Sequence, residues 1–405
     1  MRRTMTPLLV AVLVVFSAQQ LLTPILAPLS RELRLTETQL GLVITVAAVA
    51  LTVASPLWGR ALDRLGLRTV LLTGLGLSTV GLAGFAAVSL AGLGSLGDGT
   101  TPTVTFLLML LTRSVLFGAG IAAVPVAALA AAGTTTTTEA ERTRAVGLVG
   151  AAQGVSLVLG PAAGGGLAAV SLLLPLYVAP VITAALLVWV FVTVSRVPAA
   201  TAAGPRTRGV RFWDSRILPL LGIGFLLYLS LGLVQVIIGF LVADRFELDA
   251  QATAGAVSIS LVAAGVVLVL AQGVLVPRLG WNPRRLLRTG TPITVVAFAL
   301  LAVAPQLWVV VVSFAVLALG LGLALPGYTA APTLVVGSEQ QGSVAGLINA
   351  TTGVTFVVGP TLGGALYQLD PVAPVIAAAV AAVLAWIVVW VAPAARRAAP
   401  VAVGV

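Results

Sequence analysis

The sequence predicts an all-α membrane protein of twelve transmembrane helices arranged as two pseudo-symmetric six-helix halves. Three observations support this fold class. Of the 405 residues, 59% are hydrophobic and only 8% are charged, whereas soluble proteins carry about 25% charged residues. The apolar residues fall into twelve stretches long enough to cross a bilayer. A glycine-rich sequence in the first half recurs in the second half.

The twelve predicted helices follow one another with short polar connections. Each can cross about 30 Å of hydrocarbon at about 1.5 Å per residue. The first could be mistaken for a secretory signal, because Arg2 and Arg3 precede it, but its apolar run continues to Leu29 and favours a spanning helix. The predicted ranges are 6–29, 38–60, 68–91, 103–132, 143–167, 174–195, 216–243, 251–276, 287–304, 306–335, 343–367 and 373–394.

The distribution of arginine predicts the orientation. All 22 basic residues are arginine. With the N-terminus inside, eighteen lie in inner segments, three (Arg31, Arg34 and Arg245) lie in outer loops, and Arg113 lies within a helix. Because inner loops carry the excess of positive charge, both termini are expected in the cytoplasm. Residues 1–196 then form one half, 197–215 a cytoplasmic linker and 216–405 the other half.

Composition also excludes several function classes. The chain has no His and no Cys, which removes thiol chemistry and the usual metal sites. The net charge of +10 is spread over loops instead of one patch, so a nucleic-acid partner is not expected. We expect no cofactor and no enzyme activity, because no nucleophile–base pair or phosphate loop is found in an aqueous domain.

The glycine-rich repeat indicates two copies of one unit. It reads G-L-V-G-A-A-Q-G-V-S-L-V-L-G-P-A-A-G-G from Gly147 and G-L-I-N-A-T-T-G-V-T-F-V-V-G-P-T-L-G-G from Gly346, with six landmarks matched at an offset of 199 residues. Such glycines allow close helix packing in lipid, and the Gly-Pro pairs could let the helices bend. The residues expected to pack or bend are Gly150, Gly154, Gly160, Pro161, Gly164, Gly165, Gly353, Gly359, Pro360, Gly363 and Gly364.

The loop after the second predicted helix reads G-R-A-L-D-R-L-G-L-R from Gly59 to Arg68. It resembles the loop signature G-x-x-x-D-R-x-G-x-R/K of the major facilitator superfamily. The G-P-x-x-G-G sequence at Gly160–Gly165 resembles the antiporter motif of that superfamily's drug:proton antiporters. The resemblance covers essentially the whole chain. It implies the major facilitator fold, alternating access, and a cavity lined by helices one, four, seven and ten.

The loop motif predicts a conformational latch. Asp63 is placed at the inner end of the second helix, where the positive N-terminus of the eleventh helix, near Ser343, would favour its charge by about 0.3–1 kcal/mol. Alternatively, the arginines of the motif serve only as orientation charges. The second half has a degraded copy at an offset of 214, in which Pro277 replaces Asp63. The predicted latch residues are Gly59, Asp63, Arg64, Gly66, Arg68 and Gly346.

Arg113 is the only charge deep inside a predicted helix. Its distance from the helix start places it about 15 Å into the bilayer, where a charge normally marks a transport pathway. The antiporters carry an Arg followed by G-x-G in this helix, but here Gly118 and Gly120 come one residue later than in the family spacing R-x-x-x-G. The alternative is an arginine satisfied by backbone carbonyls and Gln side chains.

No acid lies in the middle of a predicted span. Protons would therefore have to pass through a peripheral acid such as Asp244 or Asp63, or the coupling ion is not a proton. Polar residues on the four cavity helices are the predicted substrate contacts, although each alone is more often interhelical glue. They are Gln19, Gln20, Arg113, Tyr228, Gln235 and Tyr328.

These observations predict a secondary transporter in the plasma membrane that exports small, mostly apolar organic compounds, with protons as the expected coupling ion. One alternative is transport of a small organic or inorganic anion, with Arg113 as its counter-charge. Another is a non-transporting sensor or scaffold of the same fold. The expected partners are the lipid bilayer and a small-molecule substrate, and we expect a monomer.

Overall fold

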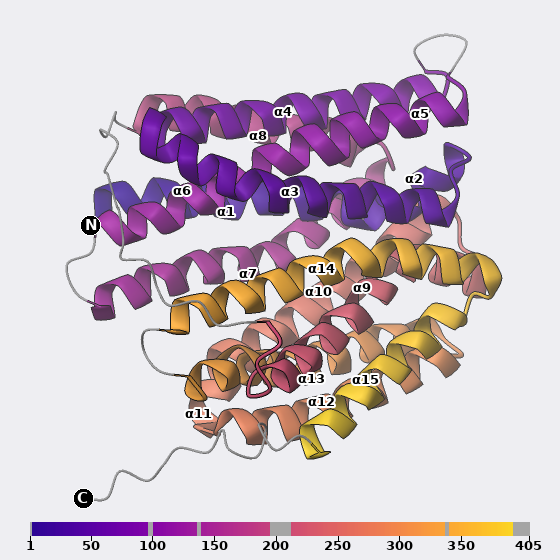
Figure 1. Ribbon diagram of the computed structural model, residues 1–405. Helices are drawn as coiled ribbons and strands as arrows, with labels where there is room; N and C mark the ends of the chain where they lie inside the picture. The colour runs from indigo at the N-terminus through magenta and orange to yellow at the C-terminus, as the bar shows by residue number, and fades with distance from the viewer. Residues whose placement is uncertain (1, 96–99, 136–138, 195–211, 337–339, 392–405) are drawn as a thin grey trace, which may run out of the picture. The chain divides into compact units, whose positions relative to one another are not determined.

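The computed structural model describes the chain except for residues 1, 96–99, 136–138, 195–211, 337–339 and 392–405 (Figure 1). Its described part consists of helices joined by short loops, with no strand among these residues. The helical elements, in chain order, are α1 (Arg2–Leu21), η1 (Thr23–Ile25), α2 (Leu26–Glu32), α3 (Glu37–Leu65), α4 (Leu67–Gly92), α5 (Pro102–Met109), η2 (Leu110–Leu116), α6 (Phe117–Thr135), α7 (Glu139–Val170), α8 (Leu174–Thr193), α9 (Leu218–Phe246), α10 (Ala250–Leu270), η3 (Ala271–Leu275), α11 (Val276–Leu279), α12 (Pro283–Val303), α13 (Leu307–Leu334), α14 (Gln341–Leu369) and α15 (Ala373–Val391).

These elements supply twelve apolar helical spans within the described residues, which confirms the predicted fold class. Three spans are interrupted by tighter or wider helical turns: the first by η1, the fourth by η2 and the eighth by η3. The 3₁₀ turn η1 contains Pro24, whose ring cannot donate a backbone hydrogen bond. The segments η2 and η3 are π-helical.

The helix ends follow from local sequence. Thr36 caps α3 by accepting the N–H of Gln39, and the Gln39 side chain accepts the N–H of Thr36 in return. Asn282 caps α12 by accepting the N–H of Arg285 with its side chain. The turn between α3 and α4 requires glycine, because Gly66 has a φ of +79°.

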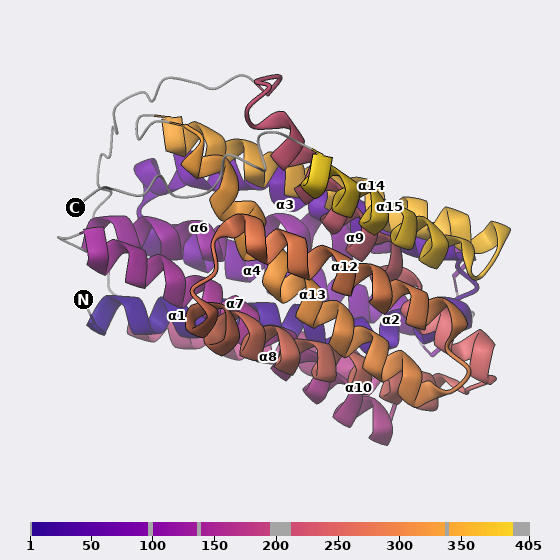
Figure 2. The same cartoon turned by 90° about the horizontal axis from the view of Figure 1, so that it is seen from below.

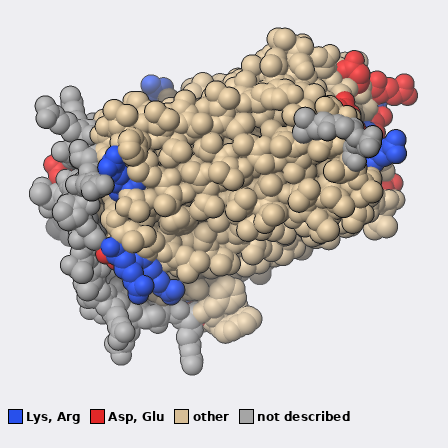
Figure 3. Space-filling view, turned by 90° about the horizontal axis from the view of Figure 1, so that it is seen from above, with Lys and Arg blue, Asp and Glu red and all other residues tan. Residues whose placement is uncertain are grey.

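The surface is that of a protein surrounded by lipid. Large apolar side chains are widely exposed along the helices, for example Val80 at 61%, Val181 at 65% and Ile376 at 54%. On the face shown in Figure 3, charged side chains gather toward two opposite ends, mostly basic at one end and mostly acidic with some basic at the other, and the side chains between them are uncharged. Such a broad apolar belt would cause aggregation in water but fits the hydrocarbon core of a bilayer.

The chain divides into two compact units. The first contains Met1–Ala203 together with Ile238–Val262, and the second contains Gly204–Ile237 and Ala263–Val405. Helix α9 therefore contributes to both units. The predicted linker lies mostly outside the described residues, and the division at 1–196, 197–215 and 216–405 stays a prediction.

Within each unit one helix crossing is repeated. In the first unit α4 and α6 meet at Gly74 and Gly120, where a Cβ on Gly120 would stand 2.6 Å from the backbone nitrogen of Ser78. In the second unit α12 and α13 lie side by side (Figures 1 and 2) and meet at Gly290 and Gly320. These small residues bring the paired helix backbones into contact, as expected for packing in a membrane.

Candidate functional site

Arg113 lies on the π-helical segment η2 within the fourth span. Its side chain is buried, with 6% of its surface exposed. The guanidinium carbon lies 4.8 Å from the centre of the Phe117 ring, a cation–π contact. Its Nε is buried without a hydrogen-bond partner. A buried donor of this kind is costly to leave unpaired, so the position is suited to receiving an acceptor from a ligand.

The π-helical turn accounts for the late spacing of the glycines after Arg113. A π-bulge places one extra residue into an α-helix. Arg113 and Gly118 are five residues apart instead of four, and the Phe117 N–H bonds to the Thr112 carbonyl across five residues. The extra residue is therefore absorbed locally, and Gly118 still meets α3, where its Cβ would lie 2.7 Å from the Ala47 carbonyl.

Neighbouring helices hold this segment in place. Ser114 donates from Oγ to the Val43 carbonyl of α3 at 2.6 Å, and Trp58 donates from its indole nitrogen to the Ala119 carbonyl at 2.7 Å. Gly81 of α4 packs on the bulge itself, since its Cβ would meet the Phe117 nitrogen at 2.6 Å. Arg113 is thus held on a braced, wider turn of the helix.

The predicted glutamines of the first span lie on α1 and are half-buried. Gln20 accepts a hydrogen bond from Thr23 Oγ1 at 3.2 Å, and its Cβ is where α1 touches Gly160 of α7. Gln20 therefore takes part in helix packing in this structure. Gln19 and Gln235 are half-buried, and their substrate role stays a prediction.

The second unit contains an aromatic cluster on α9, α13 and α14. The ring of Tyr228 lies 6.2 Å from that of Tyr328 and 6.0 Å from that of Phe356, in edge-on and tilted geometry. Tyr328 is 1% exposed, donates from its hydroxyl to the Ile348 carbonyl at 3.4 Å, and packs against Gly224, where a Cβ would overlap its ring. Tyr228 is half-buried and is the member that a ligand could reach. Phe117 and Phe356 were not predicted, because an aromatic residue in an apolar run has no distinctive sequence pattern.

The two copies of the glycine-rich repeat make equivalent helix–helix contacts. Gly160 and Gly164 of α7 lie against Ser17, Gln20 and Leu21 of α1, whereas Gly359 and Gly363 of α14 lie against Gly232 and Leu233 of α9. Gly165 meets Ser258, whose hydroxyl donates to the Pro161 carbonyl. By contrast, a Cβ on Gly150 or Gly154 would meet no atom within 4 Å. The bending role proposed for Pro161, Pro360, Gly353 and Gly364 stays a prediction.

The loop motif lies at the α3–α4 turn. Asp63 and Arg64 are exposed, and a Cβ on Gly59 or Gly346 would meet no atom within 4 Å. Arg68 has a structural contact: it donates to the Phe191 carbonyl of α8 at 2.7 Å and lies 4.8 Å from the Phe191 ring centre. Gly66 and its counterpart Gly280, 214 residues later, both have positive φ. The latch between Asp63 and the eleventh span stays a prediction.

Comparison with known proteins decides the family. The sequence model of the Major Facilitator Superfamily matches residues 8–282 and 220–404 of this chain. The chain belongs to this superfamily. It is 25% identical over 377 residues to multidrug resistance protein 2 of Bacillus subtilis (strain 168), covering 90% of this chain and 88% of the relative. It is 28% identical over 386 residues to the class E tetracycline resistance protein of Escherichia coli, covering 91% and 89%.

Solved structures of the superfamily share the fold. The crystal structure of a bacterial homologue of the iron transporter ferroportin, in an inward-facing state, aligns with a TM-score of 0.73 at 17% identity, covering 96% of this chain and 98% of that chain. The protein is thus a multi-pass membrane transporter and not an enzyme. No cluster of metal-ligating side chains occurs among the residues that the structure describes.

Proposed function

We propose that this major facilitator protein exports small, mostly apolar organic compounds across the plasma membrane, by alternating access and in exchange for protons. It would act as a monomer with both termini in the cytoplasm, as the arginine distribution indicates. The aromatic cluster of Tyr228, Tyr328 and Phe356 carries the substrate proposal. Aromatic rings offer a large apolar contact surface with a polar hydroxyl at one end, which suits amphipathic or neutral cargo.

The names of the relatives support export. The relatives named for multidrug resistance and tetracycline resistance align over most of both chains. The present chain also carries the G-P-x-x-G-G sequence at Gly160–Gly165, and it packs α7 tightly on α1 there.

A second candidate follows from Arg113. Its buried Nε lacks a hydrogen-bond partner, and a carboxylate or phosphate oxygen would satisfy it. In that case the cargo would be a small anion and Arg113 its counter-charge. If the cargo is neutral or cationic, Arg113 instead acts on coupling to the proton gradient.

Flux and binding in proteoliposomes separate these candidates. Purified protein is tested under an imposed pH gradient with neutral, cationic and anionic compounds. Tyr228→Ala removes one ring from the surface offered to the cargo and should weaken binding of an aromatic cargo about two- to tenfold, given about 0.5–1.5 kcal/mol for one aromatic–aromatic contact. Arg60→Ala, which removes an exposed arginine, serves as the control and should leave binding and flux unchanged.

The Arg113 variants give opposite results for the two candidates. For proton-driven export, Arg113→Ala should retain binding but lose gradient-driven flux. For an anion, Arg113→Lys should keep part of the binding and Arg113→Ala should abolish it. Wild-type behaviour of Arg113→Ala in both assays would remove Arg113 from either mechanism. Absence of gradient-dependent flux for every compound would refute proton-coupled export.

A further inference from the structure

Two loops at one end of the first unit are related by an offset of 213 residues. In the loop between α2 and α3, the Leu35 N–H bonds to the Ser30 carbonyl at 2.8 Å; in the loop between α9 and α10, the Leu248 N–H bonds to the Ala243 carbonyl at 3.1 Å. Arg34 and the equivalent Glu247 have left-handed φ values of 57° and 50°. The internal repeat has therefore preserved the same turn in both places.

Each turn is followed by the same helix cap. Thr36 accepts the N–H of Gln39 at the start of α3, and Asp249 accepts the N–H of Ala252 at the start of α10. Thr36 and Asp249 are again 213 residues apart. The equivalence of the two loops thus rests on backbone and side-chain bonds as well as on sequence spacing.

Three charges of one turn are reversed at the equivalent positions of the other turn. Arg31 corresponds to Asp244, Glu32 to Arg245, and Arg34 to Glu247. These are three of the five positions at which either turn carries a charge; at the other two, Thr36 corresponds to Asp249 and Glu37 to Ala250, so only one member is charged. Opposite charges at equivalent positions favour attraction between the two loops. Like charges placed opposite one another would instead repel.

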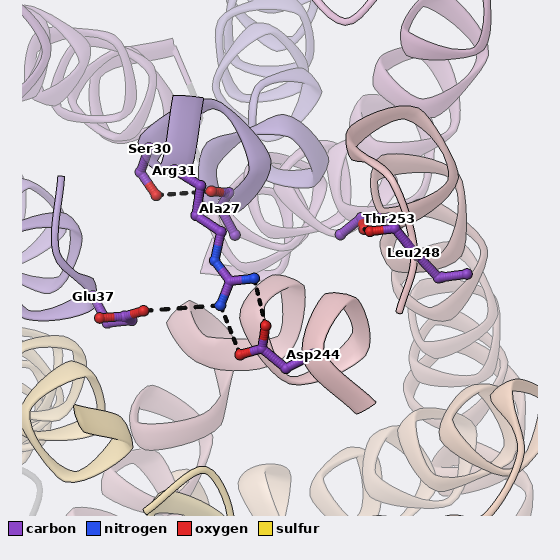
Figure 4. A network of polar contacts seen from close by, with 7 residues as sticks. All are labelled: Ala27, Ser30, Arg31, Glu37, Asp244, Leu248 and Thr253. Atoms are coloured by element: carbon purple, nitrogen blue, oxygen red, sulfur yellow. Dashed lines mark hydrogen bonds and ion pairs between the residues drawn. The ribbon is translucent and has the colours of Figure 1, made fainter. Parts of the chain in front are cut away.

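The structure joins the first pair of opposite charges directly (Figure 4). Arg31 donates from its two terminal nitrogens to Oδ1 and Oδ2 of Asp244 at 2.5 and 2.6 Å. Its guanidinium also lies 3.9 Å from a Glu37 oxygen and 5.1 Å from the centre of the Phe240 ring. A two-pronged arginine–carboxylate pair of this kind fixes geometry as well as adding attraction.

Two further close contacts involve the same part of the chain, Ile238–Val262. Gly239 of α9 meets Ala27 of α2 so closely that a larger residue would not fit. Ser258 of α10 is 6% exposed and donates to the Pro161 carbonyl of α7 at 2.5 Å. These contacts hold the segment Ile238–Val262 on helices from the first part of the sequence.

We infer that the two charge-reversed turns, 30–37 and 243–250, form a clasp that holds the segment Ile238–Val262 against α2 and α7, and that the transport cycle opens it. The Arg31–Asp244 pair sets how readily the clasp opens. Its side chains are 38% and 39% exposed, so salt should weaken the pair. The inference rests on the alternating-access part of the proposed function.

The test uses the absence of native cysteine. Ser258→Cys, a nearly isosteric change at the buried contact between this segment and α7, reports opening through its rate of reaction with a maleimide. The protein is held in nanodiscs, which expose both faces, so the predicted orientation does not enter. A half-exposed ion pair shifts a two-state population up to about fivefold, so Asp244→Asn should raise the labelling rate by up to that factor, and high salt should raise the wild-type rate.

The charge swap Arg31→Asp with Asp244→Arg should return the rate toward that of the wild type. This rescue also shows that the variants are folded. Asp249→Asn is the matched control: it removes a carboxylate from the same turn but keeps a good helix cap, so its rate should stay unchanged. Thr253→Cys, at a second buried position of the same segment, repeats the measurement in case the sulfur at 258 disturbs Gly165.

Equal labelling of Asp244→Asn and the parent protein, at both reporters, would overturn the inference. So would a charge-swapped protein that labels as fast as the single variant. The readout needs neither cargo nor a pH gradient. If export is not found but the labelling rates change as expected, only the proposed function is refuted. If export is found but the labelling rates do not change, only the clasp is refuted.

Discussion

Gly164→Ala and Gly154→Ala should change stability in opposite directions, although both replace a glycine of the same repeat on α7. A Cβ on Gly164 would overlap the Leu21 carbonyl oxygen and stand 2.9 Å from its carbon. These are backbone atoms of α1, which cannot move aside without separating the two helices. Overpacking of this kind costs about 1–3 kcal/mol.

Gly154 offers the matched case, because a Cβ there would meet nothing within 4 Å. Replacing a mid-helix glycine by alanine then contributes about 0.5–1 kcal/mol of stability. The two variants should differ by about 1.5–4 kcal/mol. The other unit should show the same contrast. A Cβ on Gly363 would overlap the Leu233 carbonyl, so Gly363→Ala should destabilise, whereas a Cβ on Gly346 would meet nothing within 4 Å.

Thermal unfolding in detergent, followed by the loss of monodisperse protein on size exclusion, measures this difference. At about 2–4 °C per kcal/mol, the Gly164 and Gly154 variants should separate by several degrees. Equal midpoints, or a less stable Gly154→Ala, would refute the packing argument. If Gly154→Ala is stable but transports poorly, Gly154 is needed for bending of α7.

Two further predictions concern the loop motif and the orientation. Asp63→Asn should leave insertion into the membrane intact but reduce transport up to about fivefold, because a helix N-terminus favours the lost charge by about 0.3–1 kcal/mol. Unchanged transport and unchanged cytoplasmic accessibility would contradict the latch. A cysteine replacing Arg206 should resist impermeant thiol reagents in intact cells, while one replacing Asp98 should react. Both positions lie outside the described residues. The opposite labelling pattern would reverse the predicted orientation.

The twelve spans could be predicted from the sequence because hydropathy over about 20 residues is a strong signal. The ends were less certain. The eighth span, predicted at 251–276, continues to Leu279 through η3 and α11, and the last, predicted at 373–394, is described as far as Val391. Helix ends depend on caps and turns such as Gly280, whose left-handed conformation ends α11.

The candidate site was only partly predictable. Arg113 stands out because a charge in an apolar run is rare, but the π-helical turn that carries it has no hydropathy signal. The glycines of the repeat could not be sorted either. Gly154 and Gly160 look alike in sequence, yet only Gly160 faces another helix, with the Ser17 carbonyl 2.9 Å from where its Cβ would be. That distinction depends on the rotation of α7 about its axis, which apolar residues on all sides leave undefined.

The charge-reversed turns were readable in the sequence but lie at an offset of 213, whereas the glycine repeat lies at 199. The difference reflects loops of unequal length between the repeated helices. The contact between the turns also explains why the charges of the two copies had to diverge. An unaltered repeat places identical residues opposite each other, and identical charges repel. Attraction between equivalent positions requires that one of them change sign, as Arg31 and Asp244 have done. Loss of one charge, as at Asp63 and Pro277, removes the repulsion without adding attraction. Opposite charges at equivalent positions of an internal repeat are therefore a sign of contact between its copies.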